Sequence, residues 1–499
     1  FFGATDPMDK VMKLDNKTNV RVTGVYEDLP YNSSFRDMNY VMPWELYLIT
    51  NDWIKKMEDP WGSNFTQAFA QIADKADMEV VSKKIIKAKY NRVGKDDQKY
   101  NPELFLHPLS KWHLYPEFKD GKNTGGRIEF VWLFGIIGIF VLLLACINFM
   151  NLSTARSEKR AKEVGIRKAI GSVRSQLIIQ FFSESILVVA LAFILSFVLV
   201  HFALPFFNEL ADKKISILWT NPVFWLAGIT FTVFTGLIAG SYPALYLSSF
   251  QPVKVLKGTF RVGRFAAIPR KVLVVLQFTV SVTLIIGTII VFRQIQHAKD
   301  RPIGYNRDGL INIYMMTSDI HNHFEAVRNE LMSSGAIMEM TESGSPTTEV
   351  WNTNGGFEWE GKDPSLAVDF PNNGVTHGYG KTVGWQFKLG RDFSREFATD
   401  STAFVINEAA VKFLGFKNPI GKIIKWNGTP YTVIGVVKDM IVQSPYAPTR
   451  GSLFHISKDS ENVMILKLNP NKSSREALAK IETIFKKYNP SAPFEYKFV

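Results

Sequence analysis

The sequence contains four long runs that hold no Asp, Glu, Lys or Arg. The runs are residues 130–152, 185–208, 222–247 and 272–292. An apolar helix of about 20 residues crosses the hydrocarbon core of a bilayer. The core of a soluble protein does not need four such helices in close succession, so we reject buried core helices as the explanation. The runs therefore predict four transmembrane helices.

The loops between these runs orient the four helices. Residues 156–174 hold seven Lys and Arg against two Glu, and residues 254–271 hold six Lys and Arg without an acid. Short loops rich in Lys and Arg stay in the cytoplasm. Residues 1–129 and 293–499 should then lie on the other side of the membrane. The basic residues behind the net charge of +12 thus flank membrane helices, and we predict no nucleic-acid partner.

The motif V-x-G-V-x-x-D occurs twice, at residues 22–28 and 433–439. The match extends upstream to Pro7 and Pro419, which are 412 positions apart, whereas the glycines of the two motifs are 411 apart. Alternating apolar residues predict a β-strand in each copy. Neither glycine lies in a phosphate-binding motif, so we assign the motif a structural role. We interpret the chain as a duplicated unit of one span, an extracytoplasmic domain and a membrane block, cut at both ends.

Together these patterns predict an α-helical membrane protein with two α+β extracytoplasmic domains and four transmembrane helices. The first domain and a membrane block of three spans belong to one unit, and the fourth span opens the second unit. The predicted divisions are residues 1–129 for the first domain, 130–253 for the membrane block, 254–271 for a cytoplasmic linker, 272–292 for the fourth span and 293–499 for the second domain.

Two other classes of membrane protein need residues that this sequence does not provide in the right places. An ion-coupled transporter uses ionisable groups inside its spans, but here only His201, near one end of the second run, offers a possible charge. A membrane-anchored enzyme is not indicated either, since the closest histidines, His321 and His323, form no zinc-binding spacing. The polar, Gly-rich residues 343–365 fit either a mobile substrate loop or ordinary loops and hairpins, and of these two open interpretations we favour the second.

Residues 125–185 carry the most specific resemblance in the chain. They include N-F-M-N-L-S-T-A-R-S, then R-A-K-E-V-G-I-R-K-A-I-G, then Q-F-F-S-E-S. This segment resembles the FtsX-like permease domain of ABC transporters. The extracytoplasmic parts resemble MacB-type periplasmic core domains, and the duplication is similar to that of large two-unit permeases from Bacteroidetes-type bacteria. Such permeases have more spans than the four predicted here.

The resemblance implies a permease subunit of an ATP-driven ABC transporter that has no ATPase motif of its own. A separate cytoplasmic ABC ATPase dimer would bind ATP, so no cofactor is expected in this chain. Other implied partners are membrane lipid and a periplasmic adaptor or outer-membrane component. The chain would be a multi-pass protein of the bacterial inner membrane with large periplasmic domains. It would export or extrude a drug, peptide or lipoprotein; the alternative is an FtsX-like mechanotransmitter that activates a periplasmic partner.

In this family the cytoplasmic helix after the first span of a membrane block meets the ATPase, which implies coupling at residues 157–171. Taken alone, this basic stretch also suffices as a positive-inside anchor. We expect its charged residues to face the ATPase, its apolar residues to pack against the membrane block, and its glycines to allow a close approach or a turn. The charged residues are Arg160, Lys162, Glu163, Arg167 and Lys168, the apolar residues are Val164, Ile166 and Ile170, and the glycines are Gly165 and Gly171.

Overall fold

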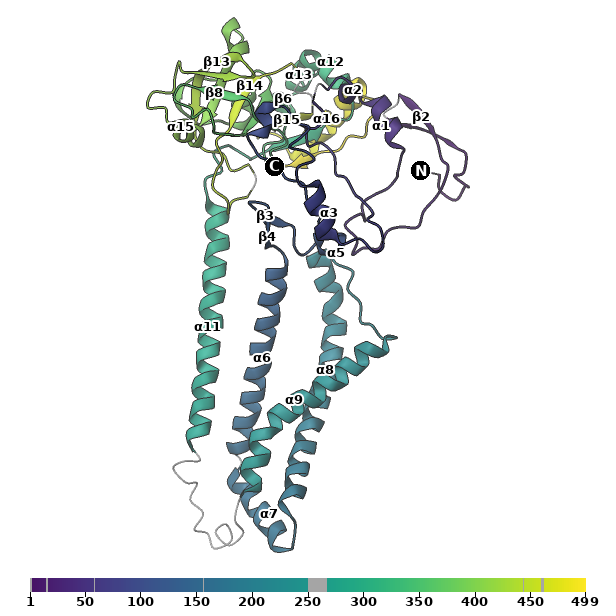
Figure 1. Ribbon diagram of the computed structural model, residues 1–499, viewed down its shortest axis with the longest axis vertical. Coiled ribbons are helices and arrows are strands. Elements are labelled where there is room, and N and C mark those ends of the chain that lie inside the picture. Colours follow the sequence, from purple (N-terminus) through teal and green to yellow (C-terminus); the bar gives the residue numbers. More distant parts are fainter. Residues whose placement is uncertain are drawn as a thin grey trace. The chain divides into compact units, whose positions relative to one another are not determined.

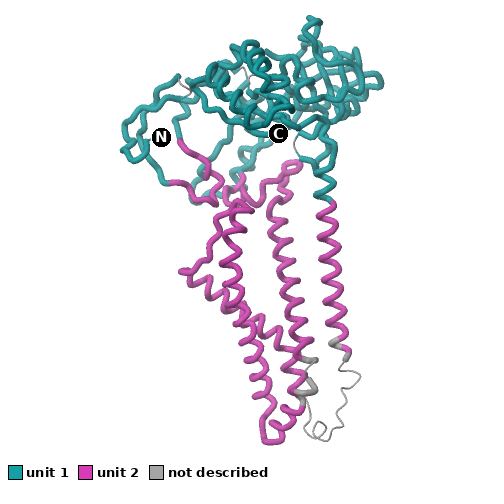
Figure 2. The backbone as a smooth tube through the Cα atoms, turned by 180° about the vertical axis from the view of Figure 1, so that it is seen from behind, with its two compact units in different colours: residues 1–27, 41–106, 294–499 teal, residues 28–40, 107–293 magenta. Residues whose placement is uncertain are grey.

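The computed structural model describes residues 2–14, 17–57, 59–155, 157–249, 267–442, 444–458 and 462–499. These residues divide into two compact units, which Figure 2 colours separately. Unit 1 holds residues 1–27, 41–106 and 294–499, and unit 2 holds residues 28–40 and 107–293. The predicted cytoplasmic linker, residues 254–271, lies outside the described residues as far as position 266.

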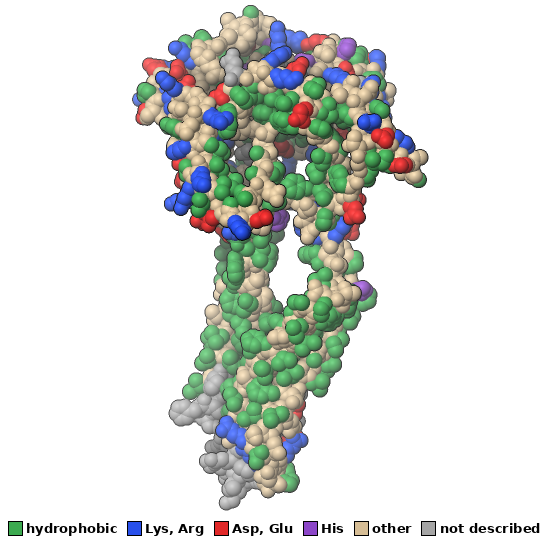
Figure 3. All heavy atoms as spheres, turned by 45° about the vertical axis from the view of Figure 1, so that its right-hand side comes forward, with side chains coloured by type: hydrophobic (Ala, Val, Ile, Leu, Met, Phe, Trp, Pro, Cys, Tyr) green, Lys and Arg blue, Asp and Glu red, His purple; other side chains and the backbone are tan. Residues whose placement is uncertain are grey.

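Four long helices coincide with the four apolar runs (Figure 1). They are α6 (Ile128–Ala155), α8 (Arg174–Ala211), α9 (Pro222–Ser248) and α11 (Ala267–Asp300). Each is long and apolar enough to cross a membrane, and hydrophobic side chains cover much of their surfaces (Figure 3). A helix that is apolar all round is suited to lipid, where its backbone must be hydrogen-bonded internally. The described residues therefore confirm the prediction of four membrane-spanning candidates.

Small residues on α9 let it approach α8 closely. A Cβ atom added to Gly236 would lie 2.7 Å from Cγ1 of Ile186, and one added to Gly240 would lie 2.7 Å from Oγ of Ser185. Two glycines four residues apart share one helix face, and such pairs allow close packing of membrane helices. On α6, Cys146 belongs to a buried cluster that also contains Ala239 of α9. Helices α6 and α8 thus both pack against α9.

The C-terminal domain, residues 301–499, is built on one mixed sheet of twelve strands. The strand order is β16-β5-β15-β6-β9-β14-β11-β13-β12-β8, with β10 also paired to β13 and β7 to β9. The pairs β11·β13 and β14·β9 are parallel, and the others are antiparallel. The strands are β5 (Leu310–Tyr314), β6 (Ile337–Ser343), β7 (Thr353–Asn354), β8 (Phe357–Trp359), β9 (Phe370–Val375), β10 (Phe387–Gly390), β11 (Ala403–Asn407), β12 (Ile423–Trp426), β13 (Thr429–Val437), β14 (Leu453–Ile456), β15 (Val463–Leu468) and β16 (Lys497–Phe498).

Amphipathic helices cover this sheet. Along α13 and α16 the apolar residues recur at three- and four-residue spacing, so each helix buries one face in a cluster with β6 and β15. The side chain of Ser473 caps α16 by accepting a hydrogen bond from the Glu476 amide at 3.2 Å. The helices are α12 (Asp319–Asn322), α13 (Phe324–Ser333), α14 (Tyr379–Val383), α15 (Glu408–Leu414) and α16 (Ser474–Tyr488), with a 3-10 turn η2 at Ala398–Thr402. The prediction of an α+β domain is confirmed here.

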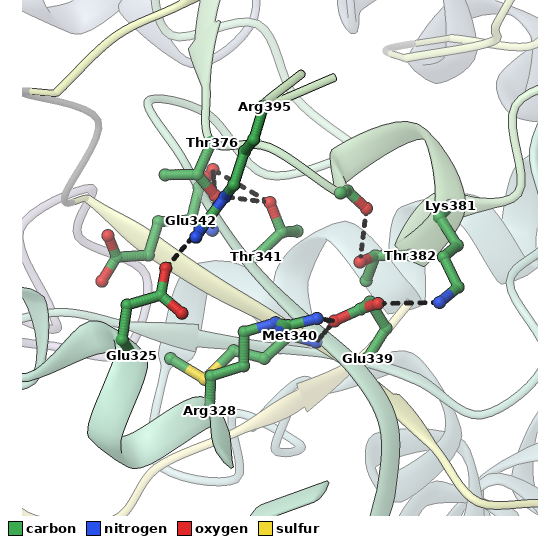
Figure 4. A network of polar contacts seen from close by, with 11 residues as sticks. Glu325, Arg328, Glu339, Met340, Thr341, Glu342, Thr376, Lys381, Thr382 and Arg395 are labelled. Atoms are coloured by element: carbon green, nitrogen blue, oxygen red, sulfur yellow. Dashed lines mark hydrogen bonds and ion pairs between the residues drawn. The ribbon is translucent and has the colours of Figure 1, made fainter. Parts of the chain in front are cut away.

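Strand β6 carries a buried carboxylate that joins two helices to the sheet (Figure 4). Glu339 is 3% exposed, and its carboxylate lies 2.5 Å from Arg328 of α13 and 3.1 Å from Lys381 of α14. Burial alone would raise the pKa of Glu339, but the hydrogen bonds from Lys381 and Arg328 outweigh it and the pKa is lowered. Glu339 is therefore ionised and paired at neutral pH, in a structural ion-pair network.

The N-terminal part is less compact than expected for a second α+β domain. Among its described residues up to 127, Val93 is the only hydrophobic side chain that is buried. Its elements are two hairpins and five short helices. They are β1 (Val11–Leu14), β2 (Thr18–Arg21), α1 (Trp44–Thr50), α2 (Asp52–Lys55), α3 (Met78–Ile85), α4 (Lys95–Gln98), α5 (Leu109–Trp112), β3 (Glu117–Lys119) and β4 (Lys122–Gly125).

The hairpin β1–β2 repeats the hairpin β12–β13 residue for residue. In the first, Val11 lies opposite Arg21 and Leu14 opposite Thr18; in the second, Ile423 lies opposite Thr432 and Trp426 opposite Thr429. Adding 412 to the residue numbers of β1 and 411 to those of β2 gives the paired residues of β12 and β13. The connection between the strands is one residue longer in the first hairpin, which accounts for the change of offset. The structure thus confirms the internal repeat.

The two copies differ in what surrounds the hairpin. Strand β13 is paired with β10, β11 and β12, which encloses the V-x-G-V residues in the sheet. The strand expected at residues 22–25 is absent from the described structure, because β2 ends at Arg21. Val25 is exposed, whereas its counterpart Val436 is buried.

Candidate functional site

The helix expected to couple the chain to an ATPase is present as α7 (Ser157–Ala169), between α6 and α8. It ends in a turn at Gly171, whose φ of +108° suits only a residue without a Cβ. The Ser172 amide donates back to the Arg167 carbonyl at 3.0 Å, which closes the helix C-terminus. Gly171 therefore supplies the predicted turn.

One face of α7 packs onto α8 and α9. Val164 is 3% exposed and lies in a cluster with Leu177 and Phe181 of α8. The same cluster contains Ala244 and Leu247 of α9. Gly165, the next residue of α7, is buried as well. The packing predicted for Val164 is confirmed, whereas the close approach predicted at Gly165 stays a prediction.

A chain of polar contacts joins the same face of α7 to α8. Nη1 of Arg160 lies 2.9 Å from Oε2 of Glu184, and Nε2 of Gln180 donates to Oε1 of Glu184 at 3.0 Å. Nη1 of Arg167 donates to Oε1 of Gln180 at 2.5 Å. Arg167 also pairs with Glu163 within α7 at 2.7 Å. We call the contacts of Arg160 and Arg167 with Glu184 and Gln180 the α7–α8 clamp.

The C-terminal end of α9 is held by two further basic residues. Nζ of Lys168 donates to the carbonyl oxygen of Ser248 at 2.6 Å, and Nε of Arg174 lies 3.4 Å from Oγ of Ser248. Ser248 is the last residue of α9 and is fully buried. Carbonyl groups at a helix C-terminus have no partner within the helix and attract cations. The basic side chains of α7 and α8 thus fix the end of α9.

The opposite face of α7 is exposed and partly apolar. Ile166 is 50% exposed and Ile170 is 81% exposed, and Lys162, one turn before Ile166, is exposed as well. The prediction that Ile166 and Ile170 pack against the membrane block is therefore wrong. The reason is helical geometry: two positions after Val164, a side chain points roughly 200° around the helix axis. Ile166 and Ile170 thus leave apolar surface exposed on this side of α7.

Charged residues of α7 divide between these two faces. Arg160, Arg167 and Lys168, which we expected to face an ATPase, instead point toward α8 and α9. Lys162 and Glu163 are exposed, as a docking surface requires. No contact in the structure tests whether any of these residues meets an ATPase, so their coupling role stays a prediction.

The residues that sequence reasoning missed are Gln180, Glu184 and Ser248. Gln180 and Glu184 are the first and fifth letters of Q-F-F-S-E-S, so the signal was present in the motif. Four residues apart on a helix, they share one face. Only the fold shows that this face meets α7.

The Gly-rich residues 343–365 are built into the sheet rather than held away from it. They contain β7 and β8, and Ser343, Ser345 and Thr347 are buried. Nδ2 of Asn373 donates to Oγ of Ser343 at 2.9 Å. Of the two interpretations left open by the sequence, ordinary strands and loops fit this part better. In the described part of the chain, no three His, Cys, Asp or Glu side chains come together as a metal site.

Two family models match the chain in the regions described above. The FtsX-like permease C-terminal model matches residues 135–252, and the MacB-like periplasmic core domain model matches residues 272–484. The chain belongs to the MacB/FtsX-like ABC transporter permeases. All of α7 and its partners on α8 and α9 fall inside the FtsX-like match.

Curated relatives share the same assignment. The macrolide export ATP-binding/permease protein MacB of Campylobacter jejuni is 29% identical over 139 residues, 28% of this chain and 21% of that protein. MacB of Bdellovibrio bacteriovorus is 26% identical over 264 residues, 51% of this chain and 37% of that protein. The ABC transporter permease YknZ of Bacillus subtilis is 23% identical over 262 residues, 51% of this chain and 58% of that protein. The match thus spans less than two thirds of each relative.

Solved structures of the family give weaker matches. The periplasmic region of MacB from Actinobacillus actinomycetemcomitans is 17% identical, with a TM-score of 0.30, and the match covers 40% of this chain and 93% of that one. A domain of a permease protein from Porphyromonas gingivalis is 12% identical, with a TM-score of 0.27, covering 37% of this chain and 86% of that one.

Proposed function

We propose that this MacB/FtsX-like permease is the membrane subunit of an ATP-driven machine and that α7 docks on a separate cytoplasmic ABC ATPase. The observation that carries the proposal is the division of α7 into two faces. One face is fixed to α8 and α9 by Val164 and the α7–α8 clamp. The other presents Lys162, Ile166 and Ile170 to solvent. A helix held this way passes a push on its exposed face to the helices beneath it.

Force applied to α7 would be transmitted through the helices α8, α9 and α6. The clamp fixes α7 to the first turns of α8, which continues as one helix for 38 residues. At 1.5 Å per residue such a helix is about 57 Å long, enough to reach beyond both membrane surfaces. Lys168 extends the contact to the end of α9, which in turn packs against α6. Motion of α7 would therefore reach the far ends of all three helices of the membrane block.

Placement and partners follow from this proposal. The chain would lie in the bacterial inner membrane with residues 1–129 and 293–499 in the periplasm. An ATPase dimer would hold the ATP, and this chain would need no cofactor of its own. A periplasmic adaptor or outer-membrane component would be a further partner. The substrate would be a drug, peptide or lipoprotein, and the printed name of the MacB relatives, macrolide export, supports the first of these.

A second function, transmission of force to a periplasmic partner without transport, is favoured by one observation. The four apolar runs hold no Asp, Glu, Lys or Arg, so these parts of the helices offer no charged path through the membrane core. Efflux by cells that lack and regain the protein separates the two functions. A restored efflux phenotype supports export, whereas a restored periplasmic enzyme activity without efflux supports transmission.

Co-purification tests the docking of the ATPase. We expect the full protein, extracted gently from its native membrane, to carry a nucleotide-binding subunit that the double variant Ile166→Ser/Ile170→Ser loses. Val173→Ser is the matched control, because Val173 is an exposed apolar residue beyond the end of α7. Retention of the ATPase by the double variant would show that α7 is not its docking surface. If the wild-type protein carries no ATPase, the proposed function is wrong.

A further inference from the structure

Residues 28–40, which we call the strap, belong to unit 2, although the hairpin β1–β2 just before them belongs to unit 1 (Figure 2). The strap is a series of turns. The Ser33 amide donates to the Pro30 carbonyl at 2.8 Å, and the Arg36 amide donates to the Ser33 carbonyl at 3.3 Å. The Met38 amide donates to the Phe35 carbonyl at 2.9 Å. These hydrogen bonds give the strap a defined shape without a helix or strand.

The strap meets α8 at the end farthest from α7. There Asp212 adopts the left-handed conformation, with φ of +47°, directly after the last helical residue. The Lys213 amide donates to the Asn208 carbonyl at 2.9 Å. The Asn208 side chain in turn donates to the Ile215 carbonyl at 2.8 Å and accepts from the Ile215 amide at 3.0 Å. The helix end is thus closed, and the Asp212 carboxylate has a fixed direction.

Two strap residues converge on that carboxylate. Nη2 of Arg36 lies 3.1 Å from Oδ2 of Asp212, and the Tyr31 hydroxyl donates to Oδ1 of Asp212. The Arg36 guanidinium lies 4.4 Å from the centre of the Tyr31 ring, and Nζ of Lys214 lies 4.8 Å from it. Hydrogen bonds from Tyr31 and then Arg36 lower the pKa of Asp212, so it is ionised at neutral pH. The Asp212 carboxylate therefore holds two strap side chains, and Lys214 packs over the ring of one of them.

The strap has a second anchor near the start of α6. The rings of Phe35 and Trp112 are 5.8 Å apart and meet edge to face, and Trp112 is the last residue of α5. From there the chain leads to α6, and the Ile128 amide donates to the Leu114 carbonyl at 3.0 Å. The strap thus contacts the end of one membrane helix and the segment that leads into another.

The second copy of the repeat also ends on a membrane helix. After β13, Asp439 and the residues that follow it pack against the chain that leaves α11. The Ile441 amide donates to the Ile303 carbonyl at 3.0 Å, and the Arg301 guanidinium donates to the Pro445 carbonyl. A Cβ at Gly304 would overlap the Asp439 carbonyl oxygen. Both V-x-G-V-x-x-D copies are therefore followed by a segment fixed at the end of a membrane helix.

We propose that the strap transmits motion of α8 to the first extracytoplasmic domain and that Asp212 is the residue that positions it. This inference rests on the proposed function, because it names the contact through which motion of α7 and α8 would pass from the membrane block to the first extracytoplasmic domain. Residues 22–27 join the strap to β2, so a displacement of Asp212 would be passed along this link to the hairpin. Asp212→Asn removes the charge while keeping a residue type that tolerates the left-handed conformation.

Amide hydrogen exchange of the full protein with its ATPase, in lipid nanodiscs, tests the proposal. We expect Asp212→Asn to raise exchange of residues 31–38 roughly fivefold, the factor for losing one exposed charge network. We also expect ATP to change exchange of the β1–β2 hairpin in the wild type but not in this variant, while the change at α7 persists. Glu209→Gln is the control, since Glu209 is exposed one turn earlier and its side chain makes no ion pair among the described residues.

Each outcome decides a different claim. An unaltered ATP response of the hairpin in Asp212→Asn would overturn the role of the strap and leave the proposed function intact. An ATP response absent from the wild type at α7 as well as at the hairpin would overturn the proposed function, and the role of the strap with it. Equal effects of Glu209→Gln and Asp212→Asn would show that general charge, not the strap contact, is responsible.

Discussion

Glu184 is the residue on which the α7–α8 clamp converges, since Arg160 and Gln180 both donate to its carboxylate. We predict that Glu184→Gln uncouples ATP hydrolysis from motion of the extracytoplasmic domains. The cost in folding should be small, because a partly exposed ion pair contributes roughly 1 kcal/mol or less. The measurement is ATP hydrolysis alongside amide exchange of the C-terminal domain.

The matched control for Glu184 is Glu209→Gln, an exposed glutamate on the same helix whose side chain makes no ion pair among the described residues. We expect this variant to keep the ATP response. If both variants behave alike, the clamp to α8 is not the route of coupling.

His455 on β14 makes the C-terminal domain sensitive to acid. Its Nδ1 lies 3.0 Å from Oδ1 of Asn372, its ring packs 5.0 Å from the Trp426 ring, and burial lowers its pKa to about 4. The unfolded chain, with an ordinary His pKa of about 6.5, binds a proton first as the pH falls. The contribution of neutral His455 to the free energy of unfolding is therefore fully present above about pH 6.5. It is lost as the pH falls toward 4, by up to about 3 kcal/mol.

We predict that His455→Gln removes most of this pH dependence. Exchange rates of β14 amides at pH 7 and pH 5, corrected for the intrinsic effect of pH, measure it. His323→Gln is the control, because His323 is exposed. A wild-type β14 equally protected at both pH values would contradict the assignment.

At the scale of the element, β6 shows how one buried carboxylate holds two helices in place (Figure 4). We predict that Glu339→Ala loosens α13 and α14 and destabilises the C-terminal domain by roughly 2 kcal/mol, the range for losing hydrogen bonds to charged groups. Because the pKa of Glu339 is lowered in the folded protein, its ion pairs stabilise the fold above about pH 4.5. This stabilisation is lost as the pH falls below that value. Thermal unfolding of the full protein, followed by tryptophan fluorescence, measures the effect.

Glu325→Ala serves as the control for Glu339, since Glu325 pairs with Arg395 on the surface of the same network. An exposed pair contributes little, so this variant should unfold close to the wild type. If Glu325→Ala lowered the stability of the domain more than Glu339→Ala, the claim that the buried carboxylate holds the helices in place would be wrong.

The elements were predictable to different degrees, for physical reasons. The membrane helices follow from local composition, because a span needs only length and apolar side chains. The faces of α7 were not predictable in full: Val164 packs inward and Ile166 does not, although both are β-branched and apolar. Their difference depends on which side of the helix meets α8. The clamp likewise requires residues 160 and 184 to be brought together by the fold.

At the scale of the whole molecule, the internal repeat was the most informative sequence feature. The hairpins β1–β2 and β12–β13 share one register, although the strand predicted at the first motif, residues 22–25, is absent from the described structure. The first copy does not acquire the core of the second, in which β13 is paired with β10, β11 and β12. A repeat therefore predicts local pairing reliably, whereas burial depends on every neighbouring strand.

The central claim is that the exposed face of α7 meets an ATPase while its other face meets α8 and α9. A photo-cross-linking amino acid placed at position 166 or at position 164, in cells, tests it most directly. We predict an adduct between position 166 and a nucleotide-binding subunit, and at position 164 only cross-links within the chain. An ATPase adduct from position 164, or none from position 166, would contradict the account.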